Sequence, residues 1–332
     1  MIDFGVECYE GALPETLKRR LTAFLLAQGL RYEPGEFTVC LRLADGDIAA
    51  AGLMAGSVFK CIAVDDRLRG EGLTATVMTA LRTRAFEKGV RHVFLFTKPK
   101  NAWMFREFGF FPISQTGDML LMENVRGGID GFIASLDHGP DGGVHGAVVA
   151  NCNPFTLGHR RLIEYAASQC GTLHLFILSE DKSAVPAAVR LALARRGVED
   201  LKNVLVHPTS DYLISAVTFP TYFLKDQASA AESAGRLDLT IFCDHFAPAL
   251  HLTRRFVGRE PFCPVTAAYN RLMKELLPPR GVEVVEIPRL ERDGTAISAS
   301  RVRALWKERR WDELRPLVPE STFRYLSTGL WE

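Results

Sequence analysis

The stretch Ala147-Val148-Val149-Ala150-Asn151-Cys152-Asn153-Pro154-Phe155-Thr156-Leu157-Gly158-His159 decides the fold of this 332-residue chain. Its first four residues are apolar, and an amphipathic run follows it at 160–167. This order predicts a strand, a tight turn and a helix. Thr156, Gly158 and His159 place a hydroxyl, a glycine that permits close approach and an imidazole at the start of that helix. Because unpaired N–H groups and the helix dipole favour anions there, the turn is a predicted phosphate-binding site.

Strand-like and helical runs alternate through the second part of the chain. Candidate strands are 146–150, 173–178, 203–207, 239–243 and 282–287, and candidate helices are 159–169, 186–196 and 223–234. Such βα units predict a parallel sheet with helices on both faces, a Rossmann-like α/β domain. Ligands of these sheets bind beyond the carboxyl ends of the strands, which is where the turn lies.

The first part of the chain predicts a mixed α+β sheet. Helices are expected at 14–28 and 74–88, and strands at 37–43, 48–54, 58–64, 92–97 and 119–122. A glycine-rich segment, 126–144, divides the chain and is the expected linker. We therefore expect a two-domain α/β protein with domains at 1–125 and 145–332.

The composition is that of a globular protein, 47% hydrophobic and 24% charged, with a net charge of +1. This balance gives no argument for a nucleic-acid or membrane partner. The seven cysteines are odd in number and never have C-x-x-C spacing, which favours free thiols in a reducing compartment. No apolar run reaches the length of about 18 residues that a membrane helix needs, and no basic signal region begins the chain. We expect a cytoplasmic protein.

A second candidate phosphate site is Ile297-Ser298-Ala299-Ser300-Arg301-Val302-Arg303, between the last predicted strand and a predicted helix at 302–309. Two hydroxyls and a guanidinium at a helix start can hold phosphate oxygens. A plain helix cap by Ser298 or Ser300 explains the serines equally well. If the first and last βα units are neighbours, both motifs face one crevice.

Together the two motifs resemble those of the nucleotidyltransferase superfamily, His/Thr-x-Gly-His and Ile-Ser-x-Ser/Thr-x-x-Arg. Most of 145–330 is more specifically similar to the citrate lyase ligase family. The segments that carry this similarity are 151–160, Ser179-Glu180-Asp181-Lys182-Ser183, Thr218-Phe219-Pro220-Thr221-Tyr222-Phe223 and Phe242-Cys243-Asp244-His245-Phe246. The resemblance implies activation of acetate with ATP, followed by acetylation of a thiol on the acyl carrier subunit of citrate lyase. That thiol belongs to a prosthetic group derived from dephospho-CoA.

Acetate is already ionised at neutral pH, so its attack on the α-phosphate of ATP needs positioning and electrostatic stabilisation rather than a general base. We expect Thr156 and His159 to bond the phosphates as charge develops. Ser298, Ser300 and Arg303 would hold the β- and γ-phosphates. Mg²⁺ is expected to arrive with the nucleotide, since the chain shows no dedicated metal site.

Two interpretations are open for several other residues near the motifs. Lys182 is a candidate phosphate ligand or a solvated lysine, and Asp244 either lines the nucleotide pocket or is a buried structural partner. Arg190 is a weaker candidate phosphate ligand, for which a salt-bridged surface position is preferred. Arg254 and Arg255 are either solvated or a contact for the carrier protein, and Cys152 is expected to pack. The remaining residues assigned to the nucleotide turn are Asn153, Pro154, Phe155 and Gly158.

A third motif lies in the first part, where Arg67, Arg69, Gly70 and Gly72 follow the strand 58–64. The glycines let backbone N–H groups approach a pyrophosphate at a helix start. The stretch that begins at Asn101 resembles the N-x-A-x-x-Y/F-x-x-x-G-F element of GNAT-type acetyltransferases. This resemblance covers roughly 1–125 and implies acyl-CoA binding along a split sheet.

These two halves suggest one reaction, in which the second part forms acetyl-adenylate and the first part presents the CoA-like thiol. Two alternatives stay open. One is an adenylyltransferase of phosphorylated small molecules fused to an independent N-acetyltransferase. The other is a nucleotidyltransferase with a regulatory CoA-sensing domain.

Overall fold

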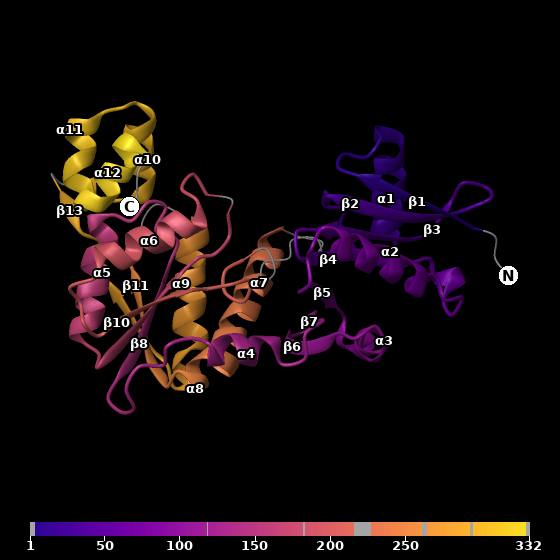
Figure 1. The fold of residues 1–332 in the computed structure, drawn as a ribbon. Coiled ribbons are helices and arrows are strands. Elements are labelled where there is room, and N and C mark those ends of the chain that lie inside the picture. The colour runs from indigo at the N-terminus through magenta and orange to yellow at the C-terminus, as the bar shows by residue number, and fades with distance from the viewer. Residues whose placement is uncertain are drawn as a thin grey trace. The chain divides into compact units, whose positions relative to one another are not determined.

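A computed structural model of the chain describes residues 4–117, 119–181, 183–215, 227–260, 264–292 and 295–329. These residues form two compact units (Figure 1). Unit 1 gathers the described residues within Met1–Gly128 and Ala216–Leu237, and unit 2 gathers those within Ile129–Ser215 and Asp238–Glu332. The expected two-domain α/β architecture is confirmed. Lys182, the stretch 218–223 and the start of the predicted helix 223–234 lie outside the described residues.

The described part of unit 1 contains a seven-stranded mixed sheet in the order β1-β2-β3-β4-β5-β7-β6. The strands are β1 (Phe4–Glu10), β2 (Phe37–Leu43), β3 (Ile48–Ala55), β4 (Val58–Val64), β5 (Phe94–Thr97), β6 (Phe111–Thr116) and β7 (Met119–Glu123). Five of them were predicted. Strands β1 and β6 were missed because they lie at the two edges, where polar residues on the exposed face weaken the apolar pattern.

Strands β4 and β5 are the parallel pair of this sheet, and they separate soon after they meet. Their ladder consists of Val58 opposite Phe94 and Phe59 opposite Leu95. Beyond these pairs β4 continues to Val64 without β5 beside it in the ladder. The split sheet implied by the acetyltransferase resemblance is therefore present, and it opens toward the turn that precedes α2 (Leu73–Glu87).

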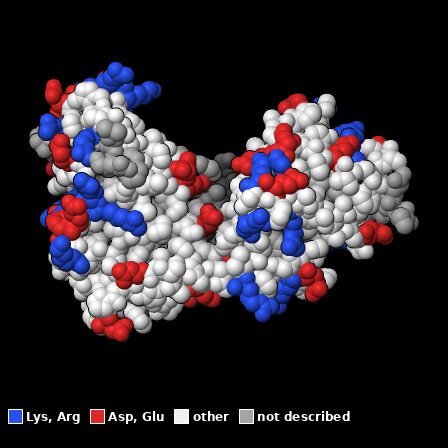
Figure 2. All heavy atoms as spheres, in the orientation of Figure 1, with Lys and Arg blue, Asp and Glu red and all other residues white. Residues whose placement is uncertain are grey.

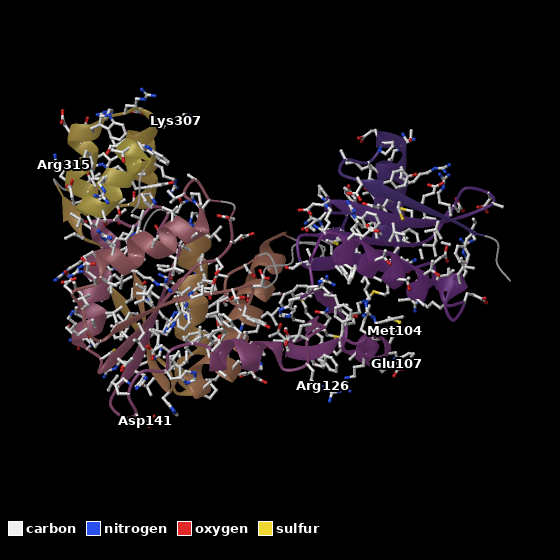
Figure 3. All side chains as sticks on the ribbon, in the orientation of Figure 1. Met104, Glu107, Arg126, Asp141, Lys307 and Arg315 are labelled. Atoms are coloured by element: carbon white, nitrogen blue, oxygen red, sulfur yellow. The ribbon has the colours of Figure 1, made fainter. Side chains whose placement is uncertain are left out.

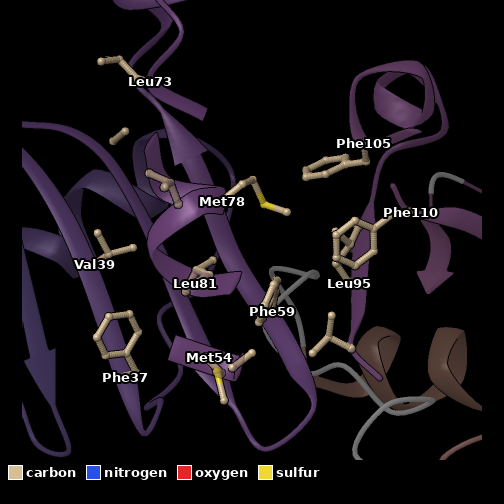
Figure 4. Close-up of a cluster of buried hydrophobic side chains, with 14 of the residues drawn as sticks. Phe37, Val39, Met54, Phe59, Leu73, Met78, Leu81, Leu95, Phe105 and Phe110 are labelled. Carbon is tan, nitrogen blue, oxygen red and sulfur yellow. The ribbon is translucent and has the colours of Figure 1, made fainter. Parts of the chain in front are cut away.

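The core of unit 1 lies between the sheet and α2, with α1 (Glu15–Ala27) and α3 (Ala102–Glu107) as further helices. Figure 4 shows Met78 and Leu81 of α2 in the same buried cluster as Phe59 of the sheet. Gly52 permits this contact, since a Cβ there would lie 2.5 Å from Val77 of α2. Each large side chain buried in this way stabilises the unit by about 1.5–3 kcal/mol.

The described part of unit 2 contains a five-stranded parallel sheet in the order β10-β9-β8-β11-β12. Its strands are β8 (His145–Ala150), β9 (Thr172–Ile177), β10 (Val204–Pro208), β11 (Leu252–Gly258) and β12 (Glu283–Ile287). The chain begins in the middle at β8, adds β9 and β10 on one side, and then adds β11 and β12 on the other. The order therefore reverses between β8 and β11, and ligands of such sheets bind beyond the strand ends at this reversal.

The predicted strand 239–243 is wrong. Helix α7 (Gln227–Ile241) covers its first part and continues into a π-helical turn, Phe242–Phe246, followed by α8 (Ala247–Ala249). The fourth strand is β11 instead. A short apolar run does not distinguish a buried helix from a strand, and Arg254 and Arg255 interrupt the apolar run of β11.

The predicted helices after β8, β9 and β12 are present as α5 (Leu157–Ser168), α6 (Ala187–Gly197) and α10 (Ala299–Lys307). Further elements of unit 2 are α9 (Pro264–Leu276), β13 (Glu291–Arg292), β14 (Thr295–Ala296), α11 (Trp311–Leu314) and α12 (Glu320–Thr328), and α4 (Gly128–Ala134) lies in the predicted linker. Helices α10, α11 and α12 share a small apolar core. Figure 3 shows Lys307 and Arg315 on this group, and both are exposed.

The surface of each unit mixes the two signs of charge. Figure 2 shows small groups of both basic and acidic side chains on the visible face of each unit, and the net charge of the chain is +1. Among the described residues, no helix is both long and apolar enough to cross a bilayer.

Candidate active site

The predicted strand, turn and helix of 147–159 are present, and Thr156 is the N-cap of α5. Its hydroxyl accepts a hydrogen bond from the N–H of His159 at 3.3 Å. In return, Nδ1 of His159 accepts one from the N–H of Thr156 at 3.0 Å. This reciprocal capping box satisfies two of the N–H groups that a helix start leaves unpaired. Because Nδ1 is an acceptor, the proton of the neutral ring is on Nε2.

The protonation state of His159 follows from its surroundings. Burial lowers the pKa of His159 to about 4, and the positive charge of Arg289 acts in the same direction. The ring is therefore neutral at pH 7, with Nδ1 engaged and Nε2–H available to donate. Such a ring stabilises negative charge on a neighbouring oxygen, and it is unsuited to removing a proton.

The two sequence motifs of unit 2 touch each other. A Cβ on Gly158 would lie 2.9 Å from the carbonyl oxygen of Ile297, so only glycine allows this approach. Nη1 of Arg303 donates to the carbonyl oxygen of Asn153 at 2.6 Å. The first and last βα units are not neighbours as supposed, because β11 lies between β8 and β12. The motifs meet because the hairpin β13–β14 precedes α10 and leads the chain back to α5.

The start of helix α10 agrees with the alternative explanation of the serines, in which one of them caps the helix. The hydroxyl of Ser298 accepts from the N–H of Arg301 at 3.2 Å and lies 3.0 Å from the hydroxyl of Ser300. An accepting hydroxyl keeps its own proton for donation, so the cap leaves Ser298 able to bond a phosphate oxygen. Ser298 lines the pocket described next, whereas Ser300 is more exposed.

A pocket of about 340 Å³ lies outside the carboxyl ends of β8, β11 and β12, with α9 as a further wall. Its size is that of a small-ligand site. Thr156, Gly158, His159, Ser298, Arg161, Arg255 and Arg289 are among its lining residues. Among the described residues that line it, none is acidic. The pocket therefore suits a negatively charged ligand at the reversal of strand order.

Three residues of the predicted nucleotide turn build the turn instead of lining the pocket. Asn153 accepts from the N–H of Val185 through Oδ1 at 3.0 Å. Phe155 is fully buried, and a Cβ on Gly197 of α6 would lie 2.4 Å from its ring. Pro154 between them is buried too. These three side chains are buried in the core of unit 2 and stabilise the turn.

Arg190 is not the surface residue that was expected, because it is 0% exposed. Its guanidinium donates to the carbonyl oxygens of Asn151, Leu178, Glu180 and Val185 at 2.6–3.0 Å. These oxygens replace water around the charge and tie the loop after β8 to the loop after β9. An arginine in an amphipathic helix carries no sequence signal for this role.

Asp244 is not where the nucleotide-pocket interpretation placed it, and Lys182 cannot be compared with its prediction. Asp244 is in the π-helical turn that precedes β11, at the amino ends of the strands, so the structure does not bring it to the pocket. Lys182 is outside the described residues. Cys152 packs as expected, and burial raises the pKa of its thiol to about 12.

Arg255 and Arg289 were missed as lining residues. Arg255 is 2% exposed, in contrast to the surface position expected for it. Arg289 lies in the loop after β12 and donates through Nε to the carbonyl oxygen of Arg259 at 2.8 Å. The rule that ligands bind beyond strand ends would have indicated Arg289, but nothing local indicates that Arg255 is buried.

The glycine turn of unit 1 has the form of a phosphate site. Gly70 and Gly72 have φ values of +92° and +75°, and a Cβ on either would meet no described atom within 4 Å. Gly72 caps α2 without a side-chain bond, and the N–H of Ala75 already bonds the carbonyl oxygen of Gly72, so the N–H groups of Leu73 and Thr74 have no side-chain cap. Arg67 and Arg69 pair with Asp65 and Asp66 of the same turn.

Asn101 lies just before α3. Its Nδ2 donates to the hydroxyl of Thr97, at the end of β5, at 3.3 Å. Because β5 is one of the two strands that separate, Asn101 lies at the end of the split in the sheet.

Known proteins resemble both units. Residues 145–326 match the family model described as the citrate lyase ligase C-terminal domain. The chain is 47% identical over 285 residues to a citrate (pro-3S)-lyase ligase of Klebsiella pneumoniae, covering 84% of this chain and 83% of that protein. It is 43% identical over 295 residues to the corresponding protein of Escherichia coli strain K12, covering 86% of this chain and 83% of that protein.

Two solved structures match parts of the chain. Thermotoga maritima TmcAL bound with alpha-thio ATP is 17% identical with a TM-score of 0.36, covering 55% of each chain. An acyl-CoA N-acyltransferase from Pseudomonas aeruginosa is 14% identical with a TM-score of 0.34, covering 37% of this chain and 100% of that chain. Both are partial matches of low identity.

Proposed function

Because the chain belongs to the citrate lyase ligase family, we propose that it activates acetate with ATP and acetylates the thiol of the citrate lyase acyl carrier subunit. The observation that carries this proposal is the pocket of unit 2. Two phosphate-binding helix starts meet there, arginines and a neutral histidine line it, and its described lining has no acidic side chain. We assign 145–332 to this adenylating domain, 1–125 to the domain that binds the CoA-like group, and 126–144 to the connection.

In the first step, a carboxylate oxygen of acetate bonds to the α-phosphorus of ATP while the bond to the β-phosphate oxygen breaks and pyrophosphate leaves. No proton moves, so the protein contributes position and charge stabilisation. Nε2–H of His159 and the hydroxyl of Thr156 donate to the phosphate oxygens at the start of α5. Ser298, Ser300 and Arg303 serve the β- and γ-phosphates, with Lys182 as a further proposed ligand.

Arg303 has two tasks in this arrangement. Its Nη1 holds the carbonyl oxygen of Asn153 and so keeps the turn in place. Its remaining N–H groups are donors for phosphate. Mg²⁺ would be held by phosphate oxygens and water, since the described residues contain no cluster of three potential ligand side chains.

In the second step, the carrier thiol loses its proton to solvent and its sulfur bonds to the acetyl carbonyl carbon, while the bond to AMP breaks. The thiol belongs to a CoA-like prosthetic group with its own pyrophosphate. The start of α2, which has no side-chain cap and has open space beside Gly70 and Gly72, supports unit 1 as the place that holds this group, as does the split between β4 and β5.

The test is pyrophosphate release from ATP with acetate, measured with and without the deacetylated carrier subunit. Acetate-dependent release, and AMP formation that requires the carrier, are expected. Release that depends on a phosphorylated small molecule instead of acetate would replace this proposal with the adenylyltransferase fused to an N-acetyltransferase. CoA binding to unit 1 without any thiol acetylation would favour the regulatory sensor.

A further inference from the structure

Arg255 is a buried cation whose hydrogen bonds are incomplete. The residue is 2% exposed, and its Nε and Nη1 have no partner among the described residues. Burying unpaired donors of a charged group is strongly unfavourable, so such an arrangement calls for a ligand. The residue also lines the 340 Å³ pocket that holds Thr156 and His159.

Tyr269 is a side-chain hydrogen-bond partner of Arg255, but no described group pairs with its Nε and Nη1. Its guanidinium lies 4.4 Å from the ring centroid of Phe242, in the π-helical turn 242–246. Turns of this type recur at functional sites. Asp238 is the acid whose charge acts on Arg255, but its carboxylate already accepts from the N–H of Ile214 at 2.6 Å and from the hydroxyl of Tyr269.

Arg255 lies deeper in the pocket than the starts of α5 and α10, which are the proposed phosphate sites. It stands three residues before Gly258, the end of β11, which is about 10 Å along a strand. Val149 and Met273 line the same pocket. A triphosphate with a hydrated cation suits the two helix starts at the strand ends. A deep cationic group beside apolar side chains suits a small carboxylate with an alkyl group.

We propose that Arg255 binds the carboxylate of the acid that is activated, an assignment that rests on the proposed function. The guanidinium holds the carboxylate below the α-phosphate, and the apolar side chains surround its alkyl end. Arg255 therefore determines affinity for the acid and leaves affinity for ATP to the two motifs.

The test compares Arg255→Lys and Arg255→Met with Arg254→Gln in the intact chain. Arg254 is the neighbouring arginine of β11, paired with Glu283 and absent from the described pocket lining, so it is a matched control. We expect both Arg255 variants to raise the Michaelis constant for acetate about 10- to 100-fold. The constant for ATP should change less than about threefold. Methylguanidinium should restore part of the acetate affinity of an Arg255→Ala variant, which loss of packing alone would not allow.

The measurements distinguish failure of the proposed function from failure of the Arg255 assignment. If the wild-type protein shows no acetate-dependent pyrophosphate release, the proposed function is wrong. If it does, but folded Arg255 variants leave the acetate constant unchanged or raise the ATP constant equally, the carboxylate assignment alone is overturned. Thermal melting of each variant establishes that it is folded, and Arg255→Met retains side-chain volume without placing a charge in the core.

Discussion

Gly158 faces the carbonyl oxygen of Ile297, which a Cβ on Gly158 would approach to 2.9 Å. This close approach brings the starts of α5 and α10 together and so brings both phosphate-binding motifs to one pocket. A backbone atom cannot move aside as a side-chain end can. The distance between the two motifs therefore depends on the absence of a single methyl group.

Replacing Gly158 with alanine should push the two helix starts apart. We expect an unfolding free energy lower by about 1–3 kcal/mol, the usual effect of overpacking. Acetate-dependent pyrophosphate release should fall about 100-fold, because small misplacements weaken catalysis strongly. Gly131→Ala in α4 is the control, since a Cβ there would meet no described atom within 4 Å. Equal activity of the two variants would contradict the role of this contact.

The pH dependence of the first step should lack a histidine transition near 6.5. The pKa of His159 is lowered to about 4, so its neutral, donating form persists from pH 8 down to about 5. Protonation would leave Nδ1 unable to accept from Thr156, and activity should fall as the pH approaches 4. The measurement is the rate of acetate-dependent pyrophosphate release against pH. A loss centred at 6.5 that disappears in a His159 variant would show that the ring is not held neutral.

His159→Ala should lower that rate about 100- to 1000-fold, as expected for the loss of one donor to developing charge. His159→Gln keeps an N–H donor near the position of Nε2 and should retain more activity than alanine. Equal rates for the two variants would mean that Nε2–H does not donate in the reaction.

Substitution in the glycine turn of unit 1 should separate the two steps. Gly70→Val and Gly72→Val fill the open space before α2 and strain a backbone with φ of +92° and +75°. Acetate-dependent pyrophosphate exchange should survive, while thiol acetylation is lost. Gly89→Val, with φ of +74° and equally open space beyond the other end of α2, carries a similar strain and should keep both activities. Loss of both steps in a folded Gly72→Val variant would refute the division of labour.

Removal of Arg190 should lower the stability of unit 2 far more than removal of an exposed arginine. Arg190→Ala removes the donor of the buried carbonyl oxygen of Val185 and of the partly buried one of Leu178, and we expect a loss of about 3 kcal/mol or more. Arg195→Ala, on the exposed side of the same helix, should change stability by less than about 0.5 kcal/mol. The measurement is the unfolding free energy of the two variants in urea. Similar free energies for both would contradict the structural role of buried Arg190.

A row of buried histidines should make unit 2 sensitive to acid. His145, His174 and His207 lie side by side on β8, β9 and β10, with ring nitrogens 3.3 Å and 3.1 Å apart. Burial lowers the pKa of His174 to about 3 and that of His207 to about 4. The unfolded chain takes up these protons near pH 6.5, so stability is full above 6.5 and falls as the pH drops toward 3.

The measurement is the unfolding free energy at pH 7 and pH 5 for the wild type and for His174→Phe. The wild type should lose stability between these values, and the variant should lose less because one proton is no longer taken up on unfolding. An unchanged pH dependence in the variant would show that this row does not control acid stability.

Local sequence determined the turn that begins the site. The apolar run of β8, the cap at Thr156 and the amphipathic α5 are contiguous, so each element is stabilised mainly by residues close to it in the chain. The same holds for the glycine turn before α2, where positive φ values require glycine. These features predicted the two-domain α/β fold and the helix starts that we propose as phosphate sites.

Tertiary structure decided which segments surround those sites. The run at 239–243 is helical because it continues α7 into the turn Phe242–Phe246, and β11 forms a strand despite Arg254 and Arg255 because β8 and β12 flank it. Arg190 is buried because carbonyl oxygens from two loops converge on it, and Arg255 because the pocket and Phe242 enclose it. Local sequence therefore set the helix starts that favour phosphate, whereas the environment of each charged side chain depended on partners brought from distant parts of the chain.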